Sequence, residues 1–157
     1  MAITRSRYRT ATSVGTFVAF LLVLIFGSPW YVDWTQKGDR GVFLETLAWP
    51  GWNLDTDASV RDVLGADLKA ILLVVFTALF LTLLVGAQLA SARGTLSAIF
   101  TGWAAYMFAA ALAAFLTTFL LPHASLGQAT LNAAGGAGYG LIVGWIIGLA
   151  TMAGRRP

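Results

Sequence analysis

The chain has 157 residues, of which 58% are hydrophobic and only 11% are charged, and its mean hydropathy is +0.77. An ordinary soluble domain carries about 25% charged residues, and one of this size cannot bury so much apolar surface. The composition therefore excludes a disordered chain and a small soluble domain, and it predicts a membrane protein.

The charged residues divide the chain into three apolar blocks, 10–32, 70–92 and 94–154. A transmembrane helix needs about 20 apolar residues, so the first two blocks each hold one span. The third block is too long for one span, and Pro122 with the polar residues after it divides the block in two. Because lipid offers the backbone no hydrogen-bond partners, the spans are expected to be helices. We therefore predict a single-domain, all-α membrane protein, residues 1–157, with four transmembrane helices in a compact bundle, near 13–31, 69–91, 96–121 and 131–153.

The first predicted span has a basic start like that of a signal peptide, with Arg5, Arg7 and Arg9 before the apolar stretch. The stretch is longer than the roughly 7–15 residues of a signal peptide, and Pro29-Trp30-Tyr31 stands where small residues would mark a cleavage site. We therefore expect a retained membrane anchor.

Residues 33–68 form a predicted outer loop of 36 residues that is rich in tryptophan. Tryptophan favours the membrane–water boundary, and it is also enriched at the centres of protein interfaces. The aromatic residues therefore predict either a membrane belt or a docking face for a partner. The residues concerned are Trp30, Trp34, Trp49 and Trp52.

Two short helices are predicted within this outer loop. The apolar pattern over 42–48 favours an interfacial helix that ends at Trp49-Pro50-Gly51, with a strand as the alternative. Asp57 is typical of a helix N-cap. The apolar spacing after it predicts an amphipathic helix that leads into the second span.

The fourth predicted span carries glycine at every fourth position, which is the pattern of a glycine zipper. Glycines so spaced form a shallow groove that lets a second helix approach closely. A ridge of small residues in the third span matches it, so the two ridges pack together either within one subunit or between subunits. The glycines are Gly136, Gly140, Gly144 and Gly148, and the ridge comprises Thr101, Ala105, Ala109, Ala113 and Thr117.

The charges predict the orientation of the chain. The four-span layout places a net charge of +6 on the side of the termini and −3 on the side of the outer loop. Because positive charge stays inside, both termini are expected in the cytoplasm and the protein in the plasma membrane. The basic residues flank membrane helices, so no nucleic-acid partner is predicted. A composition rich in Arg, Ala and Gly suggests a bacterial source, hence the inner membrane.

No Asp, Glu, Lys or Arg lies well inside a predicted span, which argues against ion and proton pathways. The chain has no cysteine, and its one histidine, His123, is expected in an exposed loop. Metal and haem sites usually need further ligands of these types. We therefore expect no catalytic, metal or cofactor site.

The leading hypothesis for function is a non-catalytic structural or accessory subunit, whose partners are the bilayer and other membrane subunits or copies of itself. The alternative is a homo-oligomeric channel or small-solute pore, lined by the Gly-, Ala- and Thr-rich third and fourth spans. A third possibility is a membrane enzyme or lipid-binding protein that uses the outer loop. Its candidate residues are Asp33, Asp39, Glu45 and His123.

Overall fold

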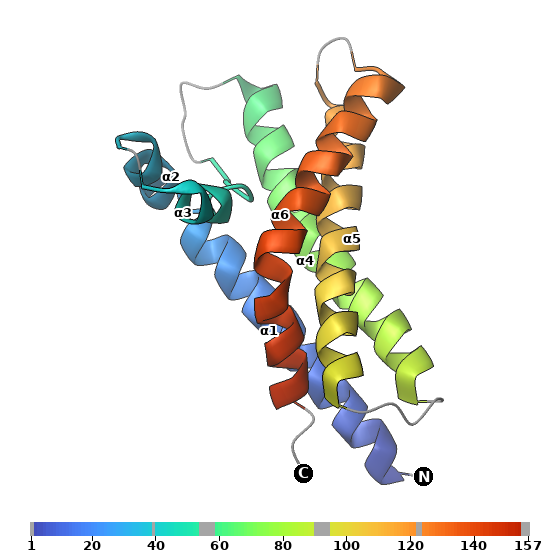
Figure 1. Ribbon diagram of the computed structural model, residues 1–157. Coiled ribbons are helices and arrows are strands. Elements are labelled where there is room, and N and C mark those ends of the chain that lie inside the picture. Colours follow the sequence, from blue (N-terminus) through green and yellow to red (C-terminus); the bar gives the residue numbers. More distant parts are fainter. Residues whose placement is uncertain (1, 39, 54–58, 90–94, 122–123, 155–157) are drawn as a thin grey trace.

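The computed structural model describes residues 2–38, 40–53, 59–89, 95–121 and 124–154, and within these ranges it contains helices and turns but no strand. Two short helices, α2 (Pro29–Gln36) and α3 (Val42–Leu47), lie at one end of four long ones (Figure 1). The prediction of an all-helical protein is confirmed, and α3 confirms the helix expected over 42–48. The long helices are α1 (Ala2–Phe26), α4 (Val60–Leu89), α5 (Thr95–Thr118) and α6 (Leu126–Ala153).

Three helices are long and apolar enough to cross a membrane: Val60–Leu84 within α4, Leu96–Thr118 within α5, and the whole of α6. A fourth candidate consists of Thr10–Phe26 of α1 together with α2, which are bent by 57° at the break between them. The chain therefore has three to four candidate spans, as a multi-pass membrane protein does.

The first predicted span, 13–31, differs from the structure because α1 ends at Phe26. Gly27 and Ser28 break the helix, and the Ser28 hydroxyl accepts a hydrogen bond from the Tyr31 N–H (3.3 Å) to start α2. A Cβ atom on Gly27 would lie 2.9 Å from the Pro50 carbonyl oxygen. Glycine at this position therefore lets a distant segment of the chain pass across the end of α1.

Helix α4 joins the predicted amphipathic helix and the second span into one element of 30 residues. At 1.5 Å per residue it is about 45 Å long, against about 30 Å for the hydrocarbon core. Ser59 and Asp62 exchange hydrogen bonds at its start: the Ser59 hydroxyl donates to Asp62 Oδ2 (2.7 Å) and accepts from the Asp62 N–H (3.2 Å). Asp57, the predicted cap, lies outside the described residues.

Each long helix packs against the next one along the chain, and α6 also packs against α1. Helices α5 and α6 are antiparallel neighbours with the most extensive contact, α4 packs on α5, and α1 lies against α4 and α6 (Figure 1). The start of α1 and the end of α6 lie at the same end of the molecule, and α2 and α3 lie at the other. We call residues 27–53, which include α2 and α3, the cap.

The four glycines at every fourth position of α6 face α5. A Cβ atom on any of them would lie 2.4–2.6 Å from an atom of α5, closer than real Cβ atoms approach their neighbours. Because the neighbouring atoms are mostly backbone, they have little freedom to move away. The close contact between α5 and α6 therefore requires the absence of side chains at Gly136, Gly140, Gly144 and Gly148.

The atoms of α5 nearest to these glycines belong to Ile99, Trp103, Met107 and Ala110. Residues Ala105, Ala109 and Ala113 of the expected ridge are fully buried but are not among these nearest neighbours. Residues two positions apart lie about 200° apart around a helix of 3.6 residues per turn, so Ala105 lies on the opposite side of α5 from Trp103 and Met107. The glycine contact lies within one chain, and a role between subunits stays a prediction.

Replacing Gly140 by leucine should lower the melting temperature in detergent micelles. The new Cβ atom would lie 2.4 Å from Met107 Cα, and overpacking of this kind costs about 1–3 kcal/mol. The matched control is Gly138→Leu, because a Cβ atom on Gly138 meets no atom within 4 Å. Equal melting temperatures for Gly140→Leu and the wild type would contradict the packing account.

Candidate functional site

Three hydrogen bonds fasten the C-terminal end of the cap to α1, to α4 and to the first residue of the cap. The Trp52 indole Nε1 donates to the Val23 carbonyl oxygen (3.1 Å), and the Trp52 backbone N–H donates to the Gly27 carbonyl oxygen (3.0 Å). The next residue, Asn53, donates its backbone N–H to Asp67 Oδ1 on α4 (2.9 Å). These bonds fix the cap at the end of the long helices.

Tyr31 holds the two cap helices together. Its side chain is buried, its ring meets Phe26 edge-on with centroids 5.0 Å apart, and its hydroxyl donates to the Leu44 carbonyl oxygen on α3 (3.0 Å). The cap is therefore a folded element with its own internal contacts.

Trp49 connects the cap to α4 and α6. Its indole stacks on the Tyr139 ring of α6, with centroids 4.7 Å apart and the ring planes within 18°. The Lys69 ammonium group of α4 lies 4.8 Å from the centroid of the Trp49 ring, within the range of a cation–π contact. The Tyr139 hydroxyl in turn lies 2.8 Å from the Tyr106 hydroxyl of α5, and both tyrosines are at most 2% exposed. One line of contacts therefore joins α4, the cap, α6 and α5.

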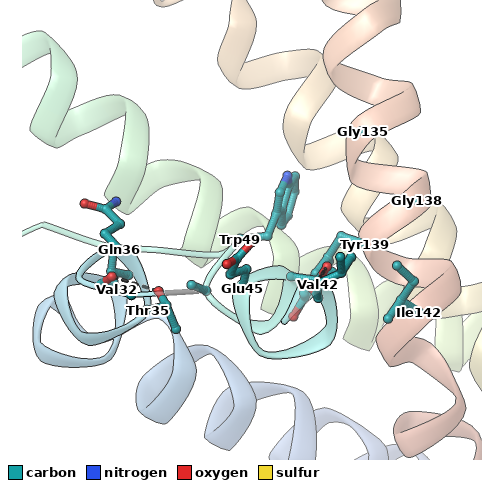
Figure 2. A pocket seen from close by; sticks show the side chains of 13 residues that line it. Val32, Thr35, Gln36, Val42, Glu45, Trp49, Gly135, Gly138, Tyr139 and Ile142 are labelled. Atoms are coloured by element: carbon teal, nitrogen blue, oxygen red, sulfur yellow. Dashed lines mark hydrogen bonds between the residues drawn. The ribbon is translucent and has the colours of Figure 1, made fainter. Parts of the chain in front are cut away.

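An open cleft with a volume of about 870 Å³ separates the cap from α6 (Figure 2). We call it the cap cleft. Polar and apolar side chains of the cap line it, together with Trp49 and Tyr139. The other lining residues are Val32, Thr35, Gln36, Gly38, Val42, Glu45, Thr46 and Ala48 from the cap, and Gly135, Gly138 and Ile142 from α6.

Two glycines of α6 keep the cap cleft open. A Cβ atom on Gly135 or Gly138 would meet no atom within 4 Å, in contrast to Gly136 and Gly140, where it would collide with α5. Helix α6 therefore uses one set of glycines for packing and leaves another set facing open space.

A second cavity of about 380 Å³ lies between the cap ends of α4, α5 and α6. We call it the Lys69 pocket. Trp49 and Gly135 line both this pocket and the cap cleft, so the Trp49 ring lies between the two cavities. The pocket is further lined by Asp62, Gly65, Lys69, Thr117, Thr118, Leu121, Leu131 and Asn132.

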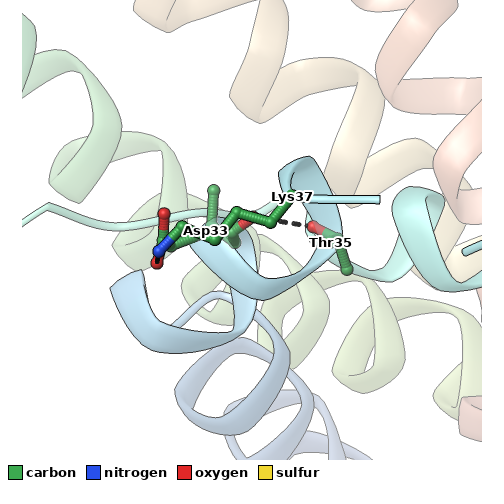
Figure 3. A network of polar contacts seen from close by, with 4 residues as sticks. Asp33, Thr35 and Lys37 are labelled. Atoms are coloured by element: carbon green, nitrogen blue, oxygen red, sulfur yellow. Dashed lines mark hydrogen bonds and ion pairs between the residues drawn. The ribbon is translucent and has the colours of Figure 1, made fainter. Parts of the chain in front are cut away.

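The end of α2 carries the only ion pair among the described residues, between Asp33 and Lys37 on the molecular surface (Figure 3). Thr35, between them, donates its hydroxyl to the Val32 carbonyl oxygen (2.8 Å). Glu45 thus lines the cap cleft without an ion-pair partner in the described part of the chain.

The four tryptophans predicted as a belt or docking face differ in their environments. Trp49 and Trp52 make the internal contacts described above. The Trp34 ring lies tilted by 39° against Tyr31, and the Arg40 guanidinium lies 4.6 Å from the centroid of the Trp34 ring. Trp30 is 74% exposed. The belt and the docking face stay predictions, and the structure adds an anchoring role for Trp49 and Trp52.

The two described candidate residues of the enzyme or lipid-binding alternative, Asp33 and Glu45, do not line the same site. Asp33 is paired with Lys37 at the surface, whereas Glu45 lies in the cap cleft. Asp39 and His123 lie outside the described residues. The described residues contain no group of three or more His, Cys, Asp or Glu side chains that could hold a metal ion.

Sequence reasoning missed three residues of this region: Lys69, Tyr106 and Tyr139. Lys69 was expected at the start of the second span, where a snorkelling lysine needs no partner. The two tyrosines were the available signal, because each places a hydroxyl in an otherwise apolar predicted span, and a buried hydroxyl needs a hydrogen-bond partner.

Comparison with known protein families, with curated proteins and with solved structures yields no match to this chain. Proposals about its function therefore depend on its own residues and geometry.

The buried tyrosine pair predicts a non-additive double-mutant cycle. Tyr139→Phe keeps the ring that stacks on Trp49 but leaves the Tyr106 hydroxyl without its 2.8 Å partner, which should destabilise the fold by about 1–3 kcal/mol. Adding Tyr106→Phe should recover most of this loss, because no buried hydroxyl then remains unpaired. Unfolding in mixed micelles measures the cycle, and additive losses would contradict the pairing.

Proposed function

We propose that this chain is a non-catalytic structural or accessory subunit of a membrane protein assembly and that it receives a segment of its partner in the cap cleft. The observation that carries the proposal is the pair of glycines, Gly135 and Gly138, that face the cleft without contacting anything. A glycine within a helix is destabilising by about 1 kcal/mol relative to alanine. Gly135 and Gly138 are not needed for packing within the chain, and a partner segment that occupies the cleft would explain why both positions are glycine.

The walls of the cap cleft indicate the chemistry of that segment. Helix α6 presents an apolar wall that includes Ile142, and the cap presents apolar side chains together with the Gln36 amide and the Glu45 carboxylate. A complementary segment is apolar on one side and carries hydrogen-bond donors or a basic group on the other. A protein segment that leaves the membrane beside this chain has this character, since its apolar part ends where its polar part begins.

The proposal includes an orientation. The start of α1 and the end of α6 lie at the end of the molecule away from the cap (Figure 1). In sequence, the excess of basic residues flanks this end, and the seven acidic residues lie on the side of the cap. The positive-inside rule then places both termini in the cytoplasm and the cap outside, in the plasma membrane of a bacterium.

The channel alternative has less support from the contacts. The surface formed by the four packing glycines of α6 is covered by α5 of the same chain. A pore between subunits would use the exposed face of α6, whose larger side chains include Leu141, Trp145 and Leu149. Such a face favours lipid or another apolar helix over a water-filled path.

The experiment compares wild type, Gly138→Leu and Gly65→Leu, each purified from its own membranes into nanodiscs and weighed by native mass spectrometry. A leucine at 138 projects into the cap cleft, whereas a leucine at 65 projects only into the Lys69 pocket, and neither Cβ atom meets a neighbour within 4 Å. Wild type and Gly65→Leu should retain a further membrane subunit in fixed stoichiometry. In Gly138→Leu, the amount of co-purified subunit should fall at least about tenfold, because loss of a central contact lowers the binding free energy by about 2 kcal/mol or more.

Two outcomes would contradict the proposal. The first is a wild-type chain that is released only as a monomer, because the proposal requires a bound partner subunit. A closed homo-oligomer that conducts ions in liposomes would instead support the channel alternative.

A further inference from the structure

The Lys69 pocket contains a cation that forms no ion pair with the carboxylate of the same pocket. Lys69 is partly buried, and its ammonium group contacts the Trp49 ring at 4.8 Å. Within the described part of the chain it takes part in no ion pair and no hydrogen bond. Removing a charge from water without a partner is unfavourable, so this position suits an anionic group from outside the chain.

The other polar groups of the pocket are largely committed to one another. The Thr118 hydroxyl donates to the Ala114 carbonyl oxygen (2.7 Å) and accepts from Asn132 Nδ2 (2.9 Å). Gln128 Nε2 donates to Asn132 Oδ1 (3.2 Å). The donors that remain are the ammonium group of Lys69 and the second N–H of the Asn132 amide. Two donors in the lining of one pocket suit the oxygen atoms of a phosphate.

The pocket also carries one carboxylate. Asp62 lies seven residues, or about two turns and 10 Å, before Lys69 on the same side of α4. Side chains on a helix lean toward its N-terminus, so Lys69 extends toward Asp62. Asp62 is exposed, whereas Lys69 is partly buried. The pocket therefore has a positive interior and a negative outer edge.

Apolar side chains complete the lining at the ends of α5 and α6. Leu121 and Leu131 line the pocket and are 41% and 68% exposed. They lie beside the polar groups, as acyl chains lie beside a lipid headgroup.

We infer that the Lys69 pocket binds a zwitterionic phospholipid with a phosphoethanolamine headgroup. The phosphate lies on Lys69 and Asn132, the ammonium group of the headgroup lies on Asp62, and the acyl chains run along Leu121 and Leu131. This site is separate from the cap cleft, and it does not depend on the function proposed for that cleft.

Competition between lipids tests the inference. Delipidated protein in detergent is mixed with equal amounts of phosphatidylethanolamine and phosphatidylglycerol, and the bound lipids are counted by native mass spectrometry. Wild type should retain one phosphatidylethanolamine in preference. Lys69→Met should lower lipid occupancy about tenfold through loss of a charge-assisted hydrogen bond. Asp62→Asn should retain lipid but lose the preference between the two headgroups.

The controls separate the site from general effects of charge and folding. Lys37→Met removes an exposed lysine, with 70% of its side chain accessible, and should bind lipid as wild type does. Gly65→Leu places a side chain in the pocket, with a Cβ atom that meets no neighbour within 4 Å, and should lose the lipid at an unchanged melting temperature, whereas Gly138→Leu should retain it. Equal occupancy in Lys69→Met and Lys37→Met would overturn the inference. A rise in melting temperature with millimolar free phosphoethanolamine would overturn the assignment to a lipid.

Discussion

The stacking of Trp49 on Tyr139 is the contact on which the arrangement of the cap depends. The same indole meets the Lys69 ammonium group, so a single side chain of the cap contacts both α4 and α6. The hydrogen bonds of Trp52 join the end of the cap to Val23 of α1 and to Gly27, but neither of them reaches α4 or α6. Without Trp49, the wall that separates the cap cleft from the Lys69 pocket would be absent.

Close packing of α5 and α6 gives this contact a rigid base. Gly136 and Gly140 bring α6 against the backbone of α5, and Tyr139, between them, reaches the Tyr106 hydroxyl. The position of the Tyr139 ring is therefore fixed by backbone contact on one side and by a buried hydrogen bond on the other. Gly138 faces the opposite way, into the cap cleft. Residues 136–140 of α6 thus both hold the Tyr139 ring in place and leave space for the cap cleft.

The sequence predicted the positions of the long helices better than the contacts between distant segments of the chain. The positions of charges marked the long helices, because lipid excludes charge. The break after Phe26 was missed, although Gly27, Ser28 and Pro29 are a local signal for a helix end; the close passage of Pro50 beside Gly27 was not predictable, because it comes from a distant part of the chain. The orientation of Trp49 was not predictable either, since its partners Lys69 and Tyr139 follow 20 and 90 positions later. A tryptophan near a predicted membrane boundary is equally consistent with lipid, a partner or the chain itself.

Hydrogen–deuterium exchange of residues 48–53 tests most directly whether Trp49 holds the cap in place. In the wild type, the N–H groups of Gly51, Trp52 and Asn53 are hydrogen-bonded, so this segment should exchange more slowly than in the unfolded chain. Trp49→Ala should accelerate its exchange, whereas Trp30→Ala, at a position 74% exposed, should leave it unchanged. Equal protection of the segment in Trp49→Ala and the wild type would contradict the account.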